Sequence, residues 1–293
     1  MFFFPFADEN PTKNKPLISW GIILVCTIIF LNYVFEQDYT KEMIFLSFGM
    51  IPALIFGYSE LSDSLNIVPP TLTIITSMFL HGGWMHLIGN MTYLYIFGDN
   101  IEETLGKIKF IIFYHLTGGC AALAQALLDP SSTIPMVGAS GAIAGILGGY
   151  LVLFPRAKIK VFFWFIIFFK VIKIRAYIVL GGWILIQFLS FNGSDLNSGG
   201  IAYAAHIGGF ISGIIFIYIM KNKKKIKHEI SKGSVPNSKW IYDDLSSISF
   251  SSKILPSPPS LIIAFKTALE ASVSKVIFSD LNTTEVPKLP GLK

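Results

Sequence analysis

Charged side chains are scarce in this 293-residue chain. Asp, Glu, Lys and Arg make up 14% of the residues, hydrophobic residues make up 53%, and the mean hydropathy is +0.61. A single globular core cannot bury that much apolar surface, which excludes an ordinary soluble domain. The composition therefore predicts a protein embedded in a lipid bilayer.

Cysteine and groups of metal-ligating residues are also scarce. The two cysteines, Cys26 and Cys120, fall inside apolar runs, which favours two buried thiols over a disulfide or a metal pair. The five histidines include no HExxH sequence, the pattern that supplies a zinc site with its own general base. We expect neither a metal nor another cofactor, with a metalloenzyme that uses His81, His86 and His206 as the alternative.

The positive net charge is not arranged as in a nucleic-acid-binding protein. The formal charge is +5, but the basic residues lie between apolar segments and not over one face with interleaved aromatic residues. Residues 1–16 lack the basic, then apolar, then small-residue order of a signal peptide. We therefore expect no nucleic-acid partner and an N-terminal segment that is retained.

Six stretches are apolar and approach the length that crosses about 30 Å of hydrocarbon. They lie at residues 17–35, 83–101, 108–128, 140–154, 174–190 and 202–220. The prediction is an all-α membrane protein with a six-transmembrane-helix domain over residues 17–220. The aromatic run VFFWFIIFF at 161–169 is too short to span and is flanked by lysines, so we interpret it as an interfacial segment.

Basic residues predict the orientation of these helices. Six crossings put both termini on one side, and the loops on that side hold most of the Lys and Arg, which marks it as cytoplasmic. These residues are Lys13, Lys15, Arg156, Lys158, Lys160, Lys170, Lys173, Arg175, Lys221, Lys223, Lys224, Lys225 and Lys227. The opposite loops are mainly acidic or neutral. We expect an integral protein of a prokaryotic inner membrane, with residues 1–16 in the cytoplasm.

Residues 221–293 have a different composition from the rest of the chain. The stretch opens with basic residues and then becomes rich in Ser and Pro, as in a tail and not a packed domain. Within it, residues 261–278 have enough apolar periodicity for an amphipathic surface helix. We expect a mostly disordered cytoplasmic tail that contributes no chemistry.

Three predicted helices carry polar residues near the end that faces away from the cytoplasm. These residues are His86 with Asn90, then Ser140, then His206. Polar groups inside a membrane are costly and usually functional. The helix that starts at Ser140 rises only roughly 22 Å, so its start lies below the membrane surface, where unpaired backbone N–H groups favour a developing negative charge.

Small residues predict close contact between the helices that carry Ser140 and His206. Gly141 and Gly145 follow Ser140, and Gly209 lies on the same stripe as His206. A hydroxyl and an imidazole on touching backbones can share a hydrogen bond of about 2.6 to 3.2 Å. Each feature alone has a plain packing interpretation, and a transporter is a further alternative, although the sequence has no inverted repeat.

These residues lie where the sequence resembles the rhomboid family of intramembrane serine proteases. The resemblance runs through HGGWMHLIGN, GDNIEETLG, GASGAIAG and AHIGG, over about residues 72–220. It implies that Ser140 of the GxSG motif is the nucleophile and that His206 of the AHxxG motif is its general base. The motif glycines Gly138, Gly141 and Gly209 are expected to shape the site.

The HxxxxHxxxN pattern of the same family falls on His81, His86 and Asn90. The resemblance implies that the last two donate hydrogen bonds to the oxyanion, together with the backbone N–H of Ser140. Both lie on one helical face because they are four residues apart. His81 precedes the helix and is expected to have a structural role.

The resemblance implies hydrolysis of a peptide bond in or beside a transmembrane segment of another membrane protein, without a cofactor. Neither 140–154 nor 202–220 contains Asp or Glu, so we expect a Ser–His dyad and not a triad. The alternative is a non-catalytic relative that binds membrane clients, but such relatives typically lack the nucleophile or the base. The substrate and the oligomeric state are left open.

Three positions bear on how fully the family pattern is kept. Residues 37–71 contain neither the Trp nor the Arg that many members carry in the first external loop. Ala144 stands one turn after the nucleophile, where some relatives have an aromatic residue that stacks on the base. Glu102 keeps the GxxxExxxG pattern, where a structural hydrogen-bonding role is expected.

Overall fold

The computed structural model describes residues 2–165, 168–193 and 201–221. Of the predicted tail, only Lys221 is among these residues. The predicted amphipathic helix at 261–278 lies outside them.

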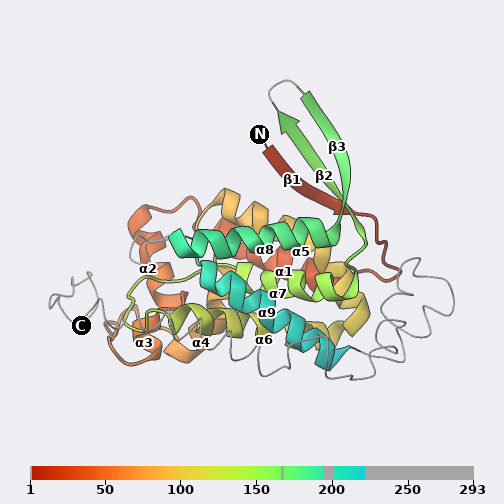
Figure 1. The fold of residues 1–293 in the computed structure, drawn as a ribbon. Coiled ribbons are helices and arrows are strands. Elements are labelled where there is room, and N and C mark those ends of the chain that lie inside the picture. The colour runs from red at the N-terminus through yellow and green to blue at the C-terminus, as the bar shows by residue number, and fades with distance from the viewer. Residues whose placement is uncertain (1, 166–167, 194–200, 222–293) are drawn as a thin grey trace.

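Six long helices occur where the apolar stretches predict them (Figure 1). They are α1 (Leu17–Tyr33), α5 (Trp84–Leu105), α6 (Lys107–Ala126), α7 (Ser140–Leu153), α8 (Ala176–Gly193) and α9 (Tyr203–Met220). The closest packing joins α9 to α7 and to α6, and α5 lies against the other side of α7. α7 is therefore surrounded by other helices, and most of its side chains are buried.

Length and apolar character vary among these helices. In the described part of the chain, α9 alone is long and apolar enough to cross a membrane by those two criteria. α1, α7 and the segment Ala176–Phe191 are apolar but shorter, and α5 carries Asp99, Glu102 and Glu103 near its end. The number of crossings thus stays a prediction.

Glu102 ties α5 to the beginning of α1. Its side chain is 4% exposed and accepts hydrogen bonds from the backbone N–H groups of Ile18 (3.0 Å) and Ser19 (2.8 Å) and from the Ser19 hydroxyl (2.9 Å). A carboxylate at a helix N-terminus satisfies backbone donors that have no partner within the helix. The structure gives Glu102 the structural role expected for it.

The connection between α1 and α5 has its own small core. It contains α2 (Asp38–Phe48), α3 (Pro52–Ile55), α4 (Pro70–Thr76) and the 3-10 turn η1 (Ser77–Phe79). The buried side chains of this core are Leu46, Ile51, Ala53, Leu54 and Leu65. A bridge between Met50 and Met136, in the loop before α7, joins it to the bundle, and a 2.6 Å bond from the Thr76 hydroxyl to the Phe48 carbonyl joins α4 to the end of α2. Apolar packing therefore anchors a loop that has neither the Trp nor the Arg.

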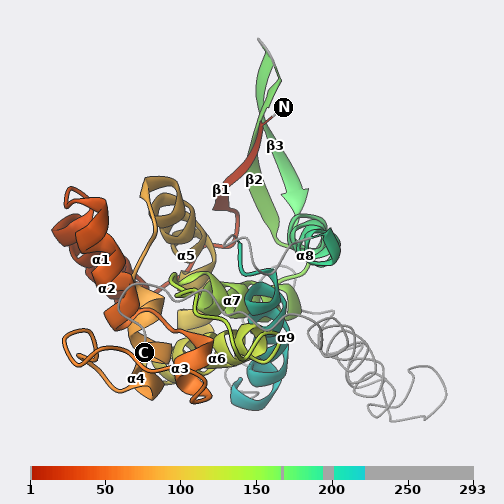
Figure 2. The same cartoon turned by 90° about the vertical axis from the view of Figure 1, so that its left-hand side faces the viewer.

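The all-α prediction is wrong for two short regions, which form one antiparallel sheet. Strands β1 (Phe2–Asp8), β2 (Lys158–Phe165) and β3 (Phe168–Arg175) pair in the order β1-β2-β3. The run interpreted as interfacial thus forms a hairpin, to which residues of the predicted N-terminal segment add a third strand. Aromatic and β-branched residues dominate these strands and favour a pleated conformation. Figures 1 and 2 show the sheet projecting from the bundle beside α8.

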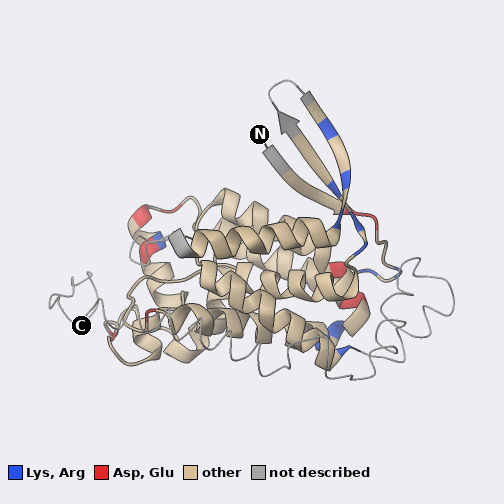
Figure 3. Cartoon of the chain, in the orientation of Figure 1, with Lys and Arg blue, Asp and Glu red and all other residues tan. Residues whose placement is uncertain are grey.

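The sheet projects from the end of the bundle that holds most of the described Lys and Arg (Figure 3). Acidic side chains occur at both ends, including Asp8 and Glu9 at the base of the sheet. Glu9 forms an ion pair with Lys173 of β3, which lowers the pKa of the Glu9 carboxyl. The basic end is the one that the sequence predicts to be cytoplasmic.

Asp8 connects the end of β1 to the bundle. Its carboxyl accepts a 2.6 Å hydrogen bond from the Tyr150 hydroxyl and a 3.1 Å bond from the Asn100 amide. Burial raises the pKa of Asp8 to about 6, against an ordinary value of 3.8; the Tyr150 bond opposes this shift and the charge of Asp99 adds to it.

The raised pKa of Asp8 predicts a pH-dependent stability. Between pH 3.8 and about 6 the folded state binds more protons than the unfolded state, so stability falls as pH rises and stays lower above that range. Asp8→Asn keeps an acceptor without the charge. The quantity to compare is the melting temperature of Asp8→Asn minus that of the wild type. We expect this difference to be about 2 to 4 °C larger at pH 7 than at pH 4. If the melting temperatures of the two proteins in detergent differ by the same amount at pH 4 and at pH 7, the pKa assigned to Asp8 is contradicted.

Candidate active site

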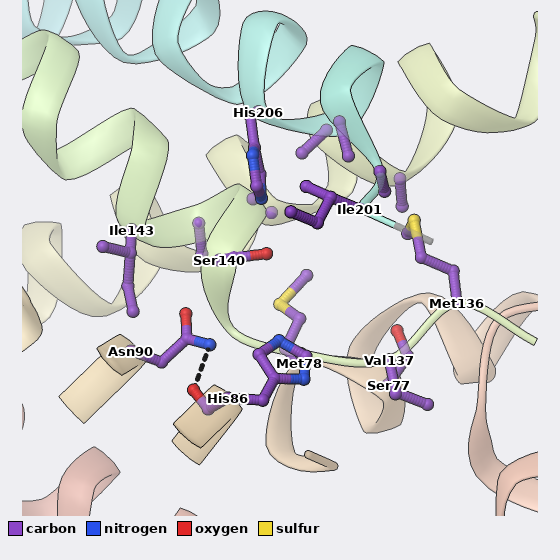
Figure 4. A pocket seen from close by; sticks show the side chains of 18 of the residues that line it. Ser77, Met78, His86, Asn90, Met136, Val137, Ser140, Ile143, Ile201 and His206 are labelled. Atoms are coloured by element: carbon purple, nitrogen blue, oxygen red, sulfur yellow. Dashed lines mark hydrogen bonds between the residues drawn. The ribbon is translucent and has the colours of Figure 1, made fainter. Parts of the chain in front are cut away.

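One cavity of about 550 Å³ lies among the helices, and every residue of the expected dyad and oxyanion site lines it. It is bounded by residues of α5, α7 and α9, by Trp183 of α8, and by the loop before α7. Figure 4 shows Ser140 between His206 on one side and His86 and Asn90 on the other. The structure therefore brings together side chains from three helices that are far apart in the sequence.

Ser140 is the first residue of α7. The hydroxyl at this position points into the cavity (Figure 4), at the end of the helix where backbone N–H groups lack helical partners. The preceding Gly138 is held by a 2.9 Å hydrogen bond from its N–H to the Ser77 carbonyl. The chain thus enters α7 along a fixed path that presents Ser140 to the cavity.

Glycines bring α7 and α9 into backbone contact, as the small-residue stripes predict. A Cβ at Gly209 would overlap the carbonyl oxygen of Gly141, and a Cβ at Gly213 would overlap that of Gly145. Larger residues would therefore separate the two helices. Because His206 lies one turn before Gly209, this contact fixes the position of the imidazole relative to Ser140.

This contact predicts a large difference between two Gly→Ala variants. Gly209→Ala must push α9 away from α7 and is expected to cost about 1 to 3 kcal/mol of stability and most of the activity. Gly181→Ala on α8 is the matched control, since a Cβ there meets nothing within 4 Å. Thermal unfolding in detergent and a proteolysis assay measure both effects. Equal behaviour of the two variants would refute the close contact as the determinant.

The His206 ring is held by two side chains of α8 that sequence reasoning missed. Its Nδ1 lies 2.7 Å from Oε1 of Gln187, and its ring centroid lies 5.6 Å from that of Trp183 at an interplanar angle of 37°. The available signal was an amide in the apolar stretch 174–190. These contacts give the His206 imidazole an orientation that Ala144, with its small side chain, does not supply.

His86 faces the same cavity from α5. Its Nδ1 accepts a 3.2 Å hydrogen bond from the N–H of Gly82, so the proton of a neutral ring lies on Nε2. The ring packs on Gly138, where a Cβ would lie 2.7 Å from Cε1 and Nε2 of His86. Gly138 also has a φ of 123°, which side chains other than glycine rarely adopt. The glycine is thus required both by backbone conformation and by the imidazole.

Asn90 lies one turn after His86 and is 8% exposed. Its amide donates a 2.8 Å hydrogen bond to the His86 carbonyl (Figure 4). An amide nitrogen carries two hydrogens, so the second remains able to donate into the cavity.

His81 does not line the cavity. It is fully buried, and its backbone is held by Tyr33, whose hydroxyl bonds the His81 carbonyl (2.8 Å) and N–H (2.7 Å). Within the described part of the chain, neither ring nitrogen of His81 has a hydrogen-bond partner. The alternative of one metal held by His81, His86 and His206 gains no support, because no group of three or more His, Cys, Asp or Glu side chains among the described residues could hold a metal ion.

The fold and this cavity define the class as a helical bundle with polar groups gathered inside it. The Rhomboid domain family matches residues 70–223. That range contains His86, Asn90, Ser140 and His206.

Relatives from three kinds of organism share this similarity. The chain is 33% identical over 248 residues to rhomboid protein 1, mitochondrial, of Saccharomyces cerevisiae, covering 75% of this chain and 67% of the relative. It is 30% identical to putative rhomboid protease YdcA of Bacillus subtilis, over 53% and 70% of the two chains. It is 26% identical to rhomboid-like protein 11, chloroplastic, of Arabidopsis thaliana, over 73% and 68%.

The chain belongs to the rhomboid family. Members are integral membrane proteins, and the family is one of intramembrane serine proteases. The relatives are mitochondrial, chloroplastic and bacterial, so family membership establishes a membrane location without selecting the membrane.

Proposed function

We propose that this chain is an intramembrane serine endopeptidase that uses Ser140 as nucleophile and His206 as general base. The observation that carries the proposal is the position of Ser140 in a cavity between the helices, with an imidazole on one side and two hydrogen-bond donors on the other. No Asp, Glu, Lys or Arg lines this cavity in the described ranges, so the proposed unit is a dyad.

The proposed reaction has two halves that use the same groups. His206 Nε2 takes the proton of the Ser140 hydroxyl as Oγ attacks the substrate carbonyl, and then gives that proton to the leaving amine. The product of this half is an ester on Ser140. Water attacks the ester in the second half, with His206 again as the base, and the serine is restored.

The proposed oxyanion site consists of His86, Asn90 and the backbone N–H of Ser140. His86 supports this role because its Nε2–H is not used by the Gly82 contact. Asn90 supports it through its remaining amide hydrogen. The positive end of α7 adds a favourable field for the negative oxygen.

The membrane arrangement is part of the proposal. We infer that α1, α5, α6, α7, α8 and α9 all cross the bilayer, that both termini are cytoplasmic, and that the cavity opens to the opposite side. Residues 1–16 and 221–293 would flank the six-helix domain of 17–220. The basic end of the bundle, from which the sheet projects, supports this orientation because Lys and Arg favour the cytoplasmic side. For the source membrane we propose the inner membrane of a prokaryote.

Substrates are proposed to be membrane proteins cut in or beside a transmembrane segment. Co-expression with a panel of single-pass membrane proteins, followed by mass spectrometry of both fragments, tests this directly. We expect cuts that depend on Ser140 and lie within or next to the apolar segment. Cuts confined to soluble domains, or fragments produced equally by Ser140→Ala, would refute the proposal.

The non-catalytic alternative predicts a different outcome. A client-binding relative would be retained with membrane proteins without cutting them, and its serine would not react with a fluorophosphonate. Metal-dependent hydrolysis would instead be lost with a strong chelator and would not depend on Ser140.

A further inference from the structure

Two side chains of α8, the aromatic Trp183 and the polar Gln187, contact His206. Trp183 and Gln187 are four residues apart and therefore share one face of α8. Both contact the imidazole, Trp183 through its ring and Gln187 through its amide oxygen at 2.7 Å. Gln187 is 8% exposed although the helix around it is apolar. An amide that is buried in such a helix needs a hydrogen-bond partner, and His206 is that partner.

The orientation of the Gln187 amide is set by its second contact. Its Nε2 points toward the Trp183 carbonyl at 3.5 Å, which leaves Oε1 facing His206. The reverse orientation would put two oxygens against each other. Because Oε1 can only accept, Nδ1 of His206 carries the proton, and Nε2 of the neutral ring is an acceptor.

We propose that Gln187 is the positioning residue of the dyad, which fixes the tautomer and the ring orientation of His206 from α8. This inference rests on the proposed function, since it concerns the same base. In Ser-His-Asp enzymes a carboxylate accepts the Nδ1–H. Here an uncharged amide does so, and it avoids the cost of burying a carboxylate in an apolar bundle. Trp183 restricts the ring on its flat side, which the Ala144 methyl group cannot do.

Few groups compete with Gln187 for the proton or charge of His206. His86 and Tyr93 of α5 are the other titratable side chains that line the cavity in the described residues. Among the elements packed against α9, α7 contributes Ser140 and α6 contributes Cys120. The Cys120 thiol is hydrogen-bonded to Ser212, which lies six residues after His206 on α9. A change at Gln187 should therefore act on His206 with little interference.

Three variants of α8 test the assignment in the full-length protein. Gln187→Met removes the acceptor at nearly constant size, and we expect kcat to fall by about 10- to 100-fold with little change in KM. The rate of fluorophosphonate labelling of Ser140 should fall equally. Ser190→Ala is the control for removing a polar group from the same helix, and it should retain wild-type kinetics.

Gln187→Glu gives the readout that a purely structural role would not move. A carboxylate next to Nδ1 favours the imidazolium form, so the acid side of the pH–rate profile should move to higher pH by about one unit or more. Wild-type kcat in Gln187→Met, or an unmoved profile in Gln187→Glu, would overturn the proposal. Wild-type protein that is not labelled at all would instead overturn the proposed function.

The wild-type protein provides a test that does not depend on the variants folding. Nitrogen-15 NMR of labelled histidine distinguishes a protonated Nδ1 from a protonated Nε2 in a neutral ring. The His206 resonance, assigned by its loss in His206→Gln, is expected to show the Nδ1–H tautomer. The Nε2–H tautomer would overturn the role of Gln187.

Discussion

Replacing Ser140 by alanine is expected to abolish proteolysis, with a fall in kcat of about 10⁴-fold or more. The reason is that, among the described residues lining the cavity, Ser140 is the serine that lies between His206 and the two proposed oxyanion donors. His206 alone can activate water only poorly, since the water is not held in the position of Oγ. Cleavage of a membrane-embedded reporter, together with labelling by a fluorophosphonate, measures the loss.

Ser77→Ala is the matched control for this prediction. Ser77 lines the same cavity, but its hydroxyl donates to the Ile74 carbonyl at 3.2 Å and serves the 3-10 turn. We expect Ser77→Ala to keep both labelling and cleavage within a few-fold of the wild type. Labelling that persists in Ser140→Ala and disappears in Ser77→Ala would show that Ser77, and not Ser140, is the nucleophile.

Replacing His86 by alanine has the second largest expected effect, a fall in kcat of about 10²- to 10³-fold. The substitution removes the donor that we propose acts on the oxyanion and not on the substrate ground state, so KM should change little. Ser140 and His206 remain in place, so slow fluorophosphonate labelling should persist. The combination of a low kcat with a reactive serine distinguishes an oxyanion donor from a member of the dyad.

His115→Ala controls for removing an imidazole from the helix bundle. His115 lies on α6 outside the cavity, where its Nδ1 bonds the Ile111 carbonyl of the same helix at 2.9 Å. We expect wild-type kcat in this variant. Equal losses in His86→Ala and His115→Ala would indicate a general effect on folding, and melting temperatures of both variants would separate the two explanations.

The positions of the long helices could be predicted from the sequence because each corresponds to an apolar stretch with polar ends. The contact of α7 with α9 could also be predicted, because glycines at helical spacing on both helices let the two backbones approach closely. These two facts were enough to bring Ser140 and His206 together. The roles of the four cavity residues remain predictions that the kinetic experiments must test.

The sheet could not be predicted in the same way. β1 and β2 are far apart in the sequence, and no local pattern says which strand a short aromatic run will pair with. Gln187 was missed for a related reason. The sequence does not tell which neighbour a single amide in an apolar helix faces. Only the position of α9 beside α8 shows that the Gln187 side chain faces His206 and not lipid.

The pairing of β1 with β2 has a consequence for how the protein is made. Phe2 is placed opposite Trp164, so the ribosome must add the whole stretch between them before the strands can meet. At about 5 to 20 residues per second this interval lasts roughly 10 to 30 seconds. The chain therefore carries an unpaired aromatic strand while α1, α5, α6 and α7 are being synthesised. Closure of the sheet joins the early and late halves of the newly made bundle.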